Sequence, residues 1–384
     1  MDSSTGLFDQ SITETVIDYA DFQAARNSKW WRVDGGMQRV AEAMQSHLLS
    51  TDWPQPGSAA VRVTTQSPVA AMSHDKQAKK MNVTVAGKPP VAYDMVFNTT
   101  AMGPLQRMDL SGLELPDKIL TGIRSLSYDR ATKVVIRFTK PWWHAAPPPE
   151  IYGGVSQTDL PISNVIYPSW NDGPDKPAVL MVSYAWAQDA TRLASLVPDY
   201  TVVPPKKDEP IVTLCLQNLA MLWKGRIPSQ NLFKDLSDMY MTHHAWAWEN
   251  DPYTGGAFAL FGPGQFKNVY PDFLWLQCEG RFAMCGEALS AHHAWIAGAF
   301  DSAYLNMYLF LAANRRIKDI DKLYRSEWFG AGKDAHSEEM DEVLMKHIVA
   351  LQFPNQQDGE SNSTAGQATS SRGNQQIPIR EHVG

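Results

Sequence analysis

The chain has 384 residues, 44% of them hydrophobic and 20% charged, so it can bury a large core and form two or three domains. Its 34 basic residues are outnumbered by 41 acidic ones, and the net charge of −7 argues against a nucleic-acid partner, because binding phosphates needs a basic surface. The three cysteines (Cys215, Cys278 and Cys285) are widely spaced without a CxxC pair, which suggests neither a disulfide framework nor a zinc knuckle.

The first predicted elements follow a segment, residues 1–15, that shows no signal peptide. Residues 34–49 (DGGMQRVAEAMQSHLL) combine a glycine turn with an apolar face and predict a helix. Residues 61–65 (VRVTT) predict a short strand. Residues 81–85 (MNVTV) and 92–100 (AYDMVFNTT) predict a hairpin that turns at GKPP.

The middle of the chain alternates strands with helices. Residues 131–138 (ATKVVIRF) predict a strand, and residues 177–196 predict a strand that runs into a helix. Residues 294–313 are apolar, but Asp301 and Asn306 interrupt them, so we expect a core helix and no membrane span. These elements predict an α/β fold class with α+β elements.

The C-terminal part divides into a helix and a tail. Residues 337–353 begin with a serine N-cap and acidic residues in the first turn, which predicts a helix. Residues 354–384 are rich in Gln, Asn, Ser and Gly, so we expect a disordered tail. Without a visible leader or anchor, we expect a cytoplasmic protein.

Two histidine doublets, His243 with His244 and His292 with His293, raise the question of a metal site. Adjacent residues on a regular element point in different directions, and no HExxH pattern accompanies them, so we predict no metal. Residues 330–335 (GAGKDA) resemble a nucleotide-binding turn, but no strand precedes them and no apolar helix follows. We therefore exclude that interpretation.

The Gly286–Glu287 pair follows a strand-like segment, residues 281–285 (RFAMC). A carboxylate there can accept hydrogen bonds from ribose or ribityl hydroxyls, and the small residues between Ala294 and Ala299 let a helix start approach a flat ring or a pyrophosphate. A tight contact between a helix and a sheet explains the same residues equally well.

Several segments, taken in order, resemble the FAD-dependent amine oxidase superfamily, especially L-amino acid oxidases and their fungal relatives. The resemblance extends from about Trp30 to Leu311. The segments that carry it are 31–44, 93–112, 128–143 (YDRATKVVIRFTKPWW), 151–169, 182–190, 244–266 (HAWAWENDPYTGGAFALFGPGQF) and 285–304 (CGEALSAHHAWIAGAFDSAY).

The resemblance implies a two-lobed fold and an FAD site. It assigns an incomplete FAD-binding Rossmann lobe to residues 35–120 and 277–312, and a mixed-sheet substrate lobe to residues 121–276. Residues 1–34 would be a helical remnant of the substrate lobe, and residues 313–353 C-terminal helices. The cofactor-binding residues would be Val63, Gly286, Glu287, Ala294, Trp295, Ile296, Ala297, Gly298 and Ala299.

The resemblance also assigns a catalytic residue and a substrate pocket. Lys133 matches the lysine that holds a water against flavin N5, where an ammonium favours reduction of O₂. Tyr184 would touch the substrate carboxylate, with Trp295 and Trp246 as pocket walls and Trp248 as a further candidate. A solvated strand lysine and ordinary aromatic core packing are the alternatives.

Members of this family begin with a strand, a GxGxxG turn and a helix, and nothing before Asp34 resembles that segment. Three explanations stand: a split enzyme whose partner chain carries the N-terminal FAD-binding segment, a truncated gene model, or a non-catalytic copy. The activity implied is oxidative deamination of a small-molecule amine or L-amino acid, with hydride passing to flavin N5 and O₂ reduced to H₂O₂. A role in secondary metabolism follows by analogy, and a pseudoenzyme or partner subunit is the competing hypothesis.

Overall fold

The computed structural model describes residues 6–26, 28–50, 61–144 and 151–324. The described residues up to Leu323 form one compact unit. The described residues combine helices with four sheets, so the predicted mixture of α and β elements is confirmed. The helix predicted at 337–353, the GAGKDA segment and the disordered tail lie outside the described residues.

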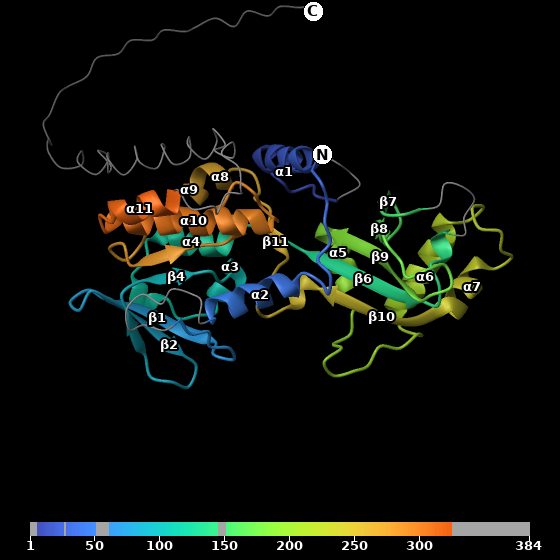
Figure 1. The fold of residues 1–384 in the computed structure, drawn as a ribbon, viewed down its shortest axis with the longest axis horizontal. Coiled ribbons are helices and arrows are strands. Elements are labelled where there is room, and N and C mark those ends of the chain that lie inside the picture. Colours follow the sequence, from blue (N-terminus) through green and yellow to red (C-terminus); the bar gives the residue numbers. More distant parts are fainter. Residues whose placement is uncertain (1–5, 27, 51–60, 145–150, 325–384) are drawn as a thin grey trace, which may run out of the picture. The chain divides into compact units, whose positions relative to one another are not determined.

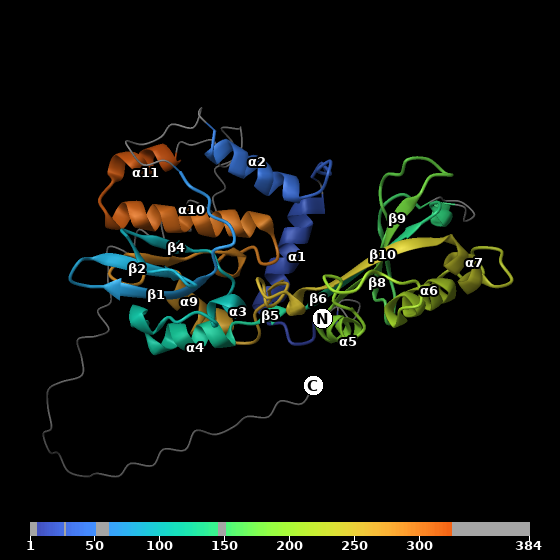
Figure 2. The same cartoon turned by 90° about the horizontal axis from the view of Figure 1, so that it is seen from below.

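The largest sheet is antiparallel and contains two of the predicted strands (Figures 1 and 2). Its spatial order is β10 (Tyr240–Ala247), β6 (Ala131–Phe138), β9 (Ala178–Trp186), β8 (Asn164–Ile166) and β7 (Val155–Gln157). β6 confirms the strand predicted at 131–138. β9 continues into the helix α5 (Ala187–Ala194), which confirms the prediction for 177–196.

Helices cover one face of this sheet. Alternate residues of β6, namely Val134, Ile136 and Phe138, are fully buried in a hydrophobic core. The core also takes in residues of α5, α6 (Pro210–Leu222) and α7 (Leu232–Met239). α6 starts with a proline, whose missing N–H is not needed in a first turn, and the Asn231 side chain caps α7 by accepting from the Lys234 N–H.

A second antiparallel sheet confirms the first part of the predicted hairpin, whereas residues 96–98 of the predicted return strand pair with another strand, residues 282–284. Its strands, in order, are β1 (Val69–Asp75), β2 (Lys80–Val85) and β3 (Val91–Tyr93). Met81 pairs with Tyr93 and Val83 with Val91. The strand predicted at 61–65 is wrong, because this segment has no regular structure. It pairs with no strand of the described residues, and an extended segment is stabilised as a strand only by a partner.

A second hydrophobic core gathers residues from 72–126 and 259–289. Two short sheets border it: β4 (Val96–Asn98) pairs in parallel with β12 (Phe282–Met284), and β5 (Tyr128–Asp129) pairs with β11 (Phe258–Ala259). β12 confirms the strand expected in RFAMC. The helices nearby in the chain are α3 (Met102–Leu105), α4 (Asp117–Ser125), α8 (Gln265–Asn268), α9 (Tyr270–Phe273) and α10 (Ile296–Ala313).

The remaining elements are helical. They are α1 (Ile12–Arg26), α2 (Gln38–Leu48), α11 (Ile317–Tyr324) and the 3₁₀ turns η1 (Ser111–Leu113), η2 (Trp142–His144), η3 (Trp248–Asn250) and η4 (Glu287–Leu289). The helix predicted at 34–49 is confirmed by α2.

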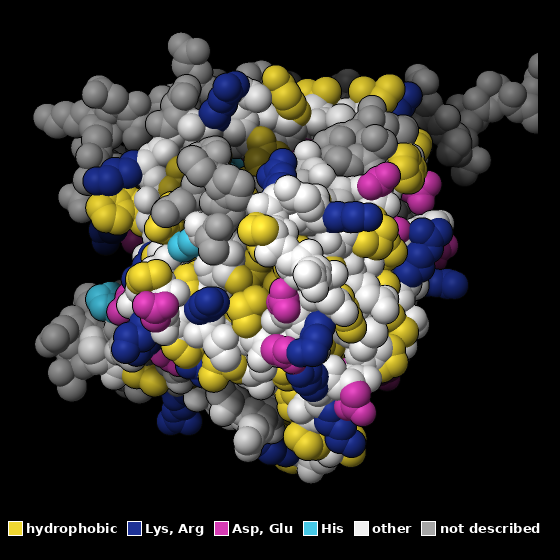
Figure 3. All heavy atoms as spheres, turned by 90° about the vertical axis from the view of Figure 1, so that its right-hand side faces the viewer, with side chains coloured by type: hydrophobic (Ala, Val, Ile, Leu, Met, Phe, Trp, Pro, Cys, Tyr) yellow, Lys and Arg dark blue, Asp and Glu magenta, His cyan; other side chains and the backbone are white. Residues whose placement is uncertain are grey.

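Within the described residues, α10 is the one helix long and apolar enough to cross a membrane by length and composition, which is weak evidence for a span. Its polar side chains contact protein: the Asn306 amide donates to the carbonyl oxygens of Met284 and Ser302. On the face drawn in Figure 3, basic and acidic side chains are interspersed with hydrophobic ones, so that face carries no field of a single sign.

The first core yields a prediction about β6. Val134 is fully buried, whereas Val179 on the neighbouring strand β9 is 49% exposed. Val134→Ala should lower the free energy of unfolding by about 2 kcal/mol, because it removes buried methyl groups and leaves a cavity. Val179→Ala, the same substitution at an exposed position, should change it by less than about 0.5 kcal/mol. Urea denaturation measures both, and equal losses would contradict the described burial.

Candidate functional site

Three residues assigned to the site by resemblance lie side by side on the large sheet. Lys133 on β6 is paired with Tyr184 on β9 and with Trp246 on β10. Residues directly opposite one another on antiparallel strands project from the same face. The Lys133 ammonium nitrogen lies 4.6 Å from the centroid of the Tyr184 ring, a cation–π distance. We call these three residues the Lys133 row.

The Lys133 row lies on the sheet face opposite the first core. β6 alternates, so Thr132 and Val134 point into the core, and the Thr132 hydroxyl donates to the carbonyl oxygen of Ala190 on α5. Lys133 itself is half-buried, and this burial lowers the pKa of its amino group. A lysine with a lowered pKa beside aromatic rings is typical of functional sites.

Aromatic rings flank the Lys133 row on both sides. Tyr184 and Trp186 meet edge to face with centroids 5.1 Å apart. Trp246 meets Trp248 at 6.0 Å and stacks with His244 at the same distance. These rings present flat apolar walls with a few polar atoms, the usual composition of a small-molecule site.

Two carboxylates near this row were missed by sequence reasoning. Asp129 is buried, its Oδ2 accepts weakly from the Ala187 N–H at 3.4 Å, and burial raises its pKa to about 6. In the described residues both carboxylate oxygens of Glu249 are buried without a hydrogen-bond partner. Asp129 stands four residues before Lys133 in YDRATK, and this short distance in the sequence could have identified it as a site residue. Nothing local marks Glu249.

The predicted cofactor segment is built around the Glu287 carboxylate. Oε1 accepts from the Ala259 N–H at 2.9 Å, and Oε2 accepts from the Ala294 N–H at 2.8 Å. Glu287 therefore joins β11 to the loop before α10. Burial raises the pKa of this carboxyl group, and its two backbone hydrogen bonds oppose the rise. Since a carboxylate has about four acceptor positions, further donors can still bind it.

The residues before α10 hold the start of that helix close to the loop. Trp295 is the N-cap residue and offers no side-chain cap, so the first-turn N–H groups are available to an acceptor. A Cβ at Gly298 would lie 2.1 Å from the His292 carbonyl oxygen, so a glycine is required there. Gly286 has a φ of 143° and open space where a Cβ would stand.

These features fit part of a flavin nucleotide. A cavity of about 220 Å³ is lined by residues that include Gly286, Glu287 and Ala299. Its volume lies below the roughly 300–1,000 Å³ of most small-molecule pockets, so it can hold only a portion of the cofactor. The open backbone at Gly286, the spare acceptor positions of Glu287 and the uncapped start of α10 suit ribityl hydroxyls and a ring edge.

Other predicted residues are placed elsewhere. Val63 is 45% exposed in the irregular segment 61–65, and it does not line the cavity. Trp295 packs edge to face on Phe22 of α1, with centroids 5.8 Å apart. Ala294, Ile296, Ala297 and Gly298 surround the start of α10 without lining the cavity. The roles assigned to these residues remain predictions.

In each histidine doublet the two side chains have different surroundings. His243 is buried and contacts Glu209, whereas His244 is exposed on the opposite face of β10. His292 contacts Asp21, and His293 contacts Glu14. Within the ranges that the structure describes, no group of three or more His, Cys, Asp or Glu side chains is arranged to hold a metal ion.

Comparisons with known proteins agree with these features. The sequence model described as "Flavin containing amine oxidoreductase" matches residues 9–305. A Dictyostelium discoideum protein named as a bifunctional amine oxidase is 35% identical over 79% of this chain and 27% of its own length. L-amino-acid oxidase 4 of Hebeloma cylindrosporum is 31% identical over 91% of this chain and 55% of its own length. This chain thus spans about half, or less, of these relatives.

Among solved structures, cyclohexylamine oxidase from Brevibacterium oxydans IH-35A overlaps 65% of this chain and 48% of its own. The TM-score is 0.47 and the identity 14%.

The buried Asp129 predicts a pH dependence of stability. Its pKa is raised from 3.8 to about 6, so the folded state binds the proton more tightly than the unfolded state does. The contribution of the protonated carboxyl group to the free energy of unfolding is fully present below about pH 4 and is lost as the pH rises through about 6. Asp129→Asn does not titrate and should remove this decline, which amounts to about 3 kcal/mol.

Urea denaturation between about pH 4 and pH 7 measures the decline. Asp175→Asn, at an exposed aspartate, is the matched control and should keep the profile of the unmodified chain. An Asp129→Asn profile as steep as that of the unmodified chain would contradict the assignment.

Proposed function

We propose that this chain, which belongs to the flavin containing amine oxidoreductase family, is a component of an FAD-dependent oxidase that acts on the CH–NH₂ group of an amine or an L-amino acid. The reaction would be oxidative deamination with reduction of O₂ to H₂O₂. L-amino-acid oxidases of Hebeloma cylindrosporum and Mus musculus are among the proteins that it resembles. Because the chain spans 55% and 42% of those two relatives, the activity of the whole protein is part of the proposal.

The Lys133 row is the observation that carries this proposal. It places a half-buried amino group between two aromatic side chains on one sheet face. That arrangement can orient an amine or amino acid by its apolar part and keep bulk water from the reacting carbon. FAD would supply the acceptor for the hydride removed from the substrate.

Side chains and backbone groups of this chain would bind the substrate, a water molecule and the cofactor. Burial raises the pKa of the Tyr184 phenol, so this hydroxyl stays protonated and can donate a hydrogen bond to a substrate carboxylate. The Lys133 nitrogen would hold a water molecule against flavin N5, and in its protonated form would stabilise negative charge on reduced oxygen. Gly286, Glu287 and the backbone of 294–299 would hold the cofactor.

A second candidate is a non-catalytic or partner subunit of a split amine oxidase. The observation that favours it is the cavity beside Glu287, whose volume of about 220 Å³ can hold only a portion of the cofactor. Such a subunit would keep the sheet and the Glu287 loop but would turn over no substrate by itself.

The visible spectrum of the purified chain tests these candidates. We expect a largely colourless and inactive protein when it is expressed alone. Co-expression with an amine-oxidase fragment that carries the GxGxxG turn should restore a flavin band and peroxide formation with an amine or L-amino acid. A stoichiometric flavin band with turnover in the lone chain would establish the oxidase without a partner. A flavin band without turnover in the co-expressed complex would favour the non-catalytic subunit.

Lys133 can be tested in the co-expressed complex. Lys133→Met should slow reoxidation of the reduced flavin by O₂ roughly 10²-fold, because a half-buried positive charge is lost where negative charge develops. The substrate KM should change little. Lys140→Met, at an exposed lysine just beyond the end of β6, is the matched control. Stopped-flow absorbance measures reoxidation, and an unchanged rate would remove Lys133 from the oxygen reaction.

A further inference from the structure

α1 turns its acidic residues inward. Glu14, Asp18 and Asp21 are spaced by four and three residues and therefore share one face of the helix. Glu14 is fully buried, whereas the apolar Ile12 and Val16 are 83% and 62% exposed. Glutamate is rarely buried unless it is paired, so the inward face requires partners.

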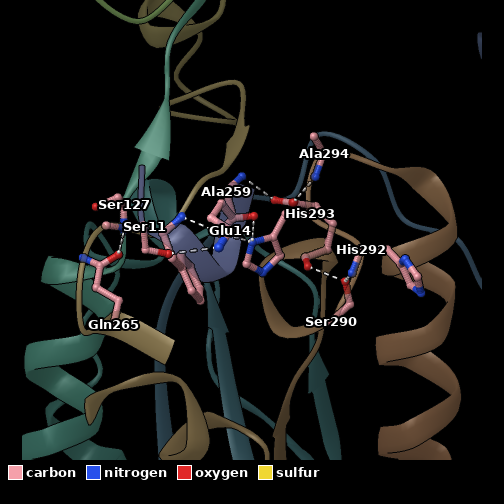
Figure 4. A network of polar contacts seen from close by, with 12 residues as sticks. Ser11, Glu14, Ser127, Ala259, Gln265, Ser290, His292, His293 and Ala294 are labelled. Carbon is pink, nitrogen blue, oxygen red and sulfur yellow. Dashed lines mark hydrogen bonds and ion pairs between the residues drawn. The ribbon is translucent and has the colours of Figure 1, made fainter. Parts of the chain in front are cut away.

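Glu14 finds those partners in two segments far along the chain (Figure 4). Its Oε2 accepts from the Phe261 N–H at 2.7 Å and lies 2.8 Å from Nδ1 of His293. Ser11 adds a second attachment, because its N–H donates to the Phe261 carbonyl oxygen at 2.9 Å. The first turn of α1 is thereby bonded to the backbone just after β11.

His293 is held on several sides. The residue is 3% exposed, and its ring stacks on Phe266 at 5.5 Å and meets the edge of Phe261 at 4.4 Å. Nδ1 faces the Glu14 carboxylate, and this contact fixes Nδ1 as the donor nitrogen. Nε2 is buried without a partner among the described residues.

α1 contacts the neighbours of His293 as well. Asp21 lies 2.6 Å from Nδ1 of His292, and Phe22 packs against the ring of Trp295. Three of the four residues of the HHAW motif (292–295) therefore contact α1.

The remaining residue of the motif, Ala294, explains why such contacts are needed. Ala294 has a φ of 66°, in the left-handed region that costs a residue with a side chain on the order of 1 kcal/mol. Strain of this kind persists only where surrounding contacts outweigh it. The Ala294 N–H donates to Glu287, and the preceding residue is bound by Glu14.

Two carboxylates thus bind the same pair of segments. Glu287 joins Ala259 to Ala294, and Glu14 joins Phe261 to His293. We propose that Glu14 and His293 are positioning residues for the cofactor-binding loop, so that α1 works as part of the flavin site. The assignment of this loop to flavin rests on the proposed function. The mechanical claim, that the pair holds the loop, does not.

Hydrogen–deuterium exchange of the purified full chain without flavin tests the mechanical claim. Glu14→Gln should speed exchange in residues 287–299 on the order of tenfold, because it removes the charged partner of His293. Residues 131–138 of β6 should be unaffected. Glu114→Gln, the same change in an exposed ion pair with Lys76, is the matched control and should leave the loop protected.

Two variants of the partner residue separate positioning from general stability. His293→Asn keeps a donor near Nδ1 and should preserve loop protection, whereas His293→Leu should lose it. If Glu14→Gln does not fold, this pair decides the question alone. Unchanged loop exchange in His293→Leu, or equal acceleration in 131–138, would overturn the proposal.

Flavin binding gives a separate readout. In the co-expressed complex, Glu14→Gln and His293→Leu should weaken FAD binding roughly tenfold while His293→Asn should not, as judged by quenching of flavin fluorescence. Equal affinity of all variants for FAD would overturn the positioning role. If the unmodified complex binds no FAD while the exchange results hold, the proposed function fails and the mechanical claim stands.

Discussion

The register of β6 between β9 and β10 is the constraint on which the candidate site depends. It puts Lys133 directly between Tyr184 and Trp246, although these residues come from three distant parts of the chain. Because side chains alternate along a strand, a slip of one residue would send Lys133 into the hydrophobic core and Val134 to the open face. The burial of Val134, Ile136 and Phe138 therefore also sets the position of the candidate catalytic lysine.

The loop before α10 depends on a different kind of interaction. Its backbone carries the left-handed Ala294 and the close approach at Gly298, neither of which is favourable by itself. Hydrogen bonds to buried carboxylates offset that cost, through Glu287 on one side and Glu14 with His293 on the other. A buried carboxylate is stable only with donors around it, so the loop and the carboxylates require each other.

Local patterns in the sequence predicted β6, β9, β12, α2 and the β2–β3 hairpin, because alternation and turn residues act over a few neighbours. The same reasoning failed at 61–65, where alternation was present but the part of the chain that the structure describes offers no partner strand. The Lys133 row was assembled from a family resemblance, and its members' proximity is a consequence of strand register. Glu14 was missed because an acidic residue in the first turn of a helix normally lies in solvent, where the positive end of the helix dipole stabilises it.

The sequence by itself determined the types of the main elements, the mixed fold class and the membership in a flavin-dependent family. Those properties depend on short-range periodicity and on motifs that follow one another along the sequence in the order typical of the family. Tertiary structure alone decided which side chains meet. The partners of Glu14 lie 247 and 279 residues further along the chain, and no local spacing connects residues so far apart. Their contact exists because the fold brings α1, the segment after β11 and the loop before α10 together, where a buried carboxylate must find its donors.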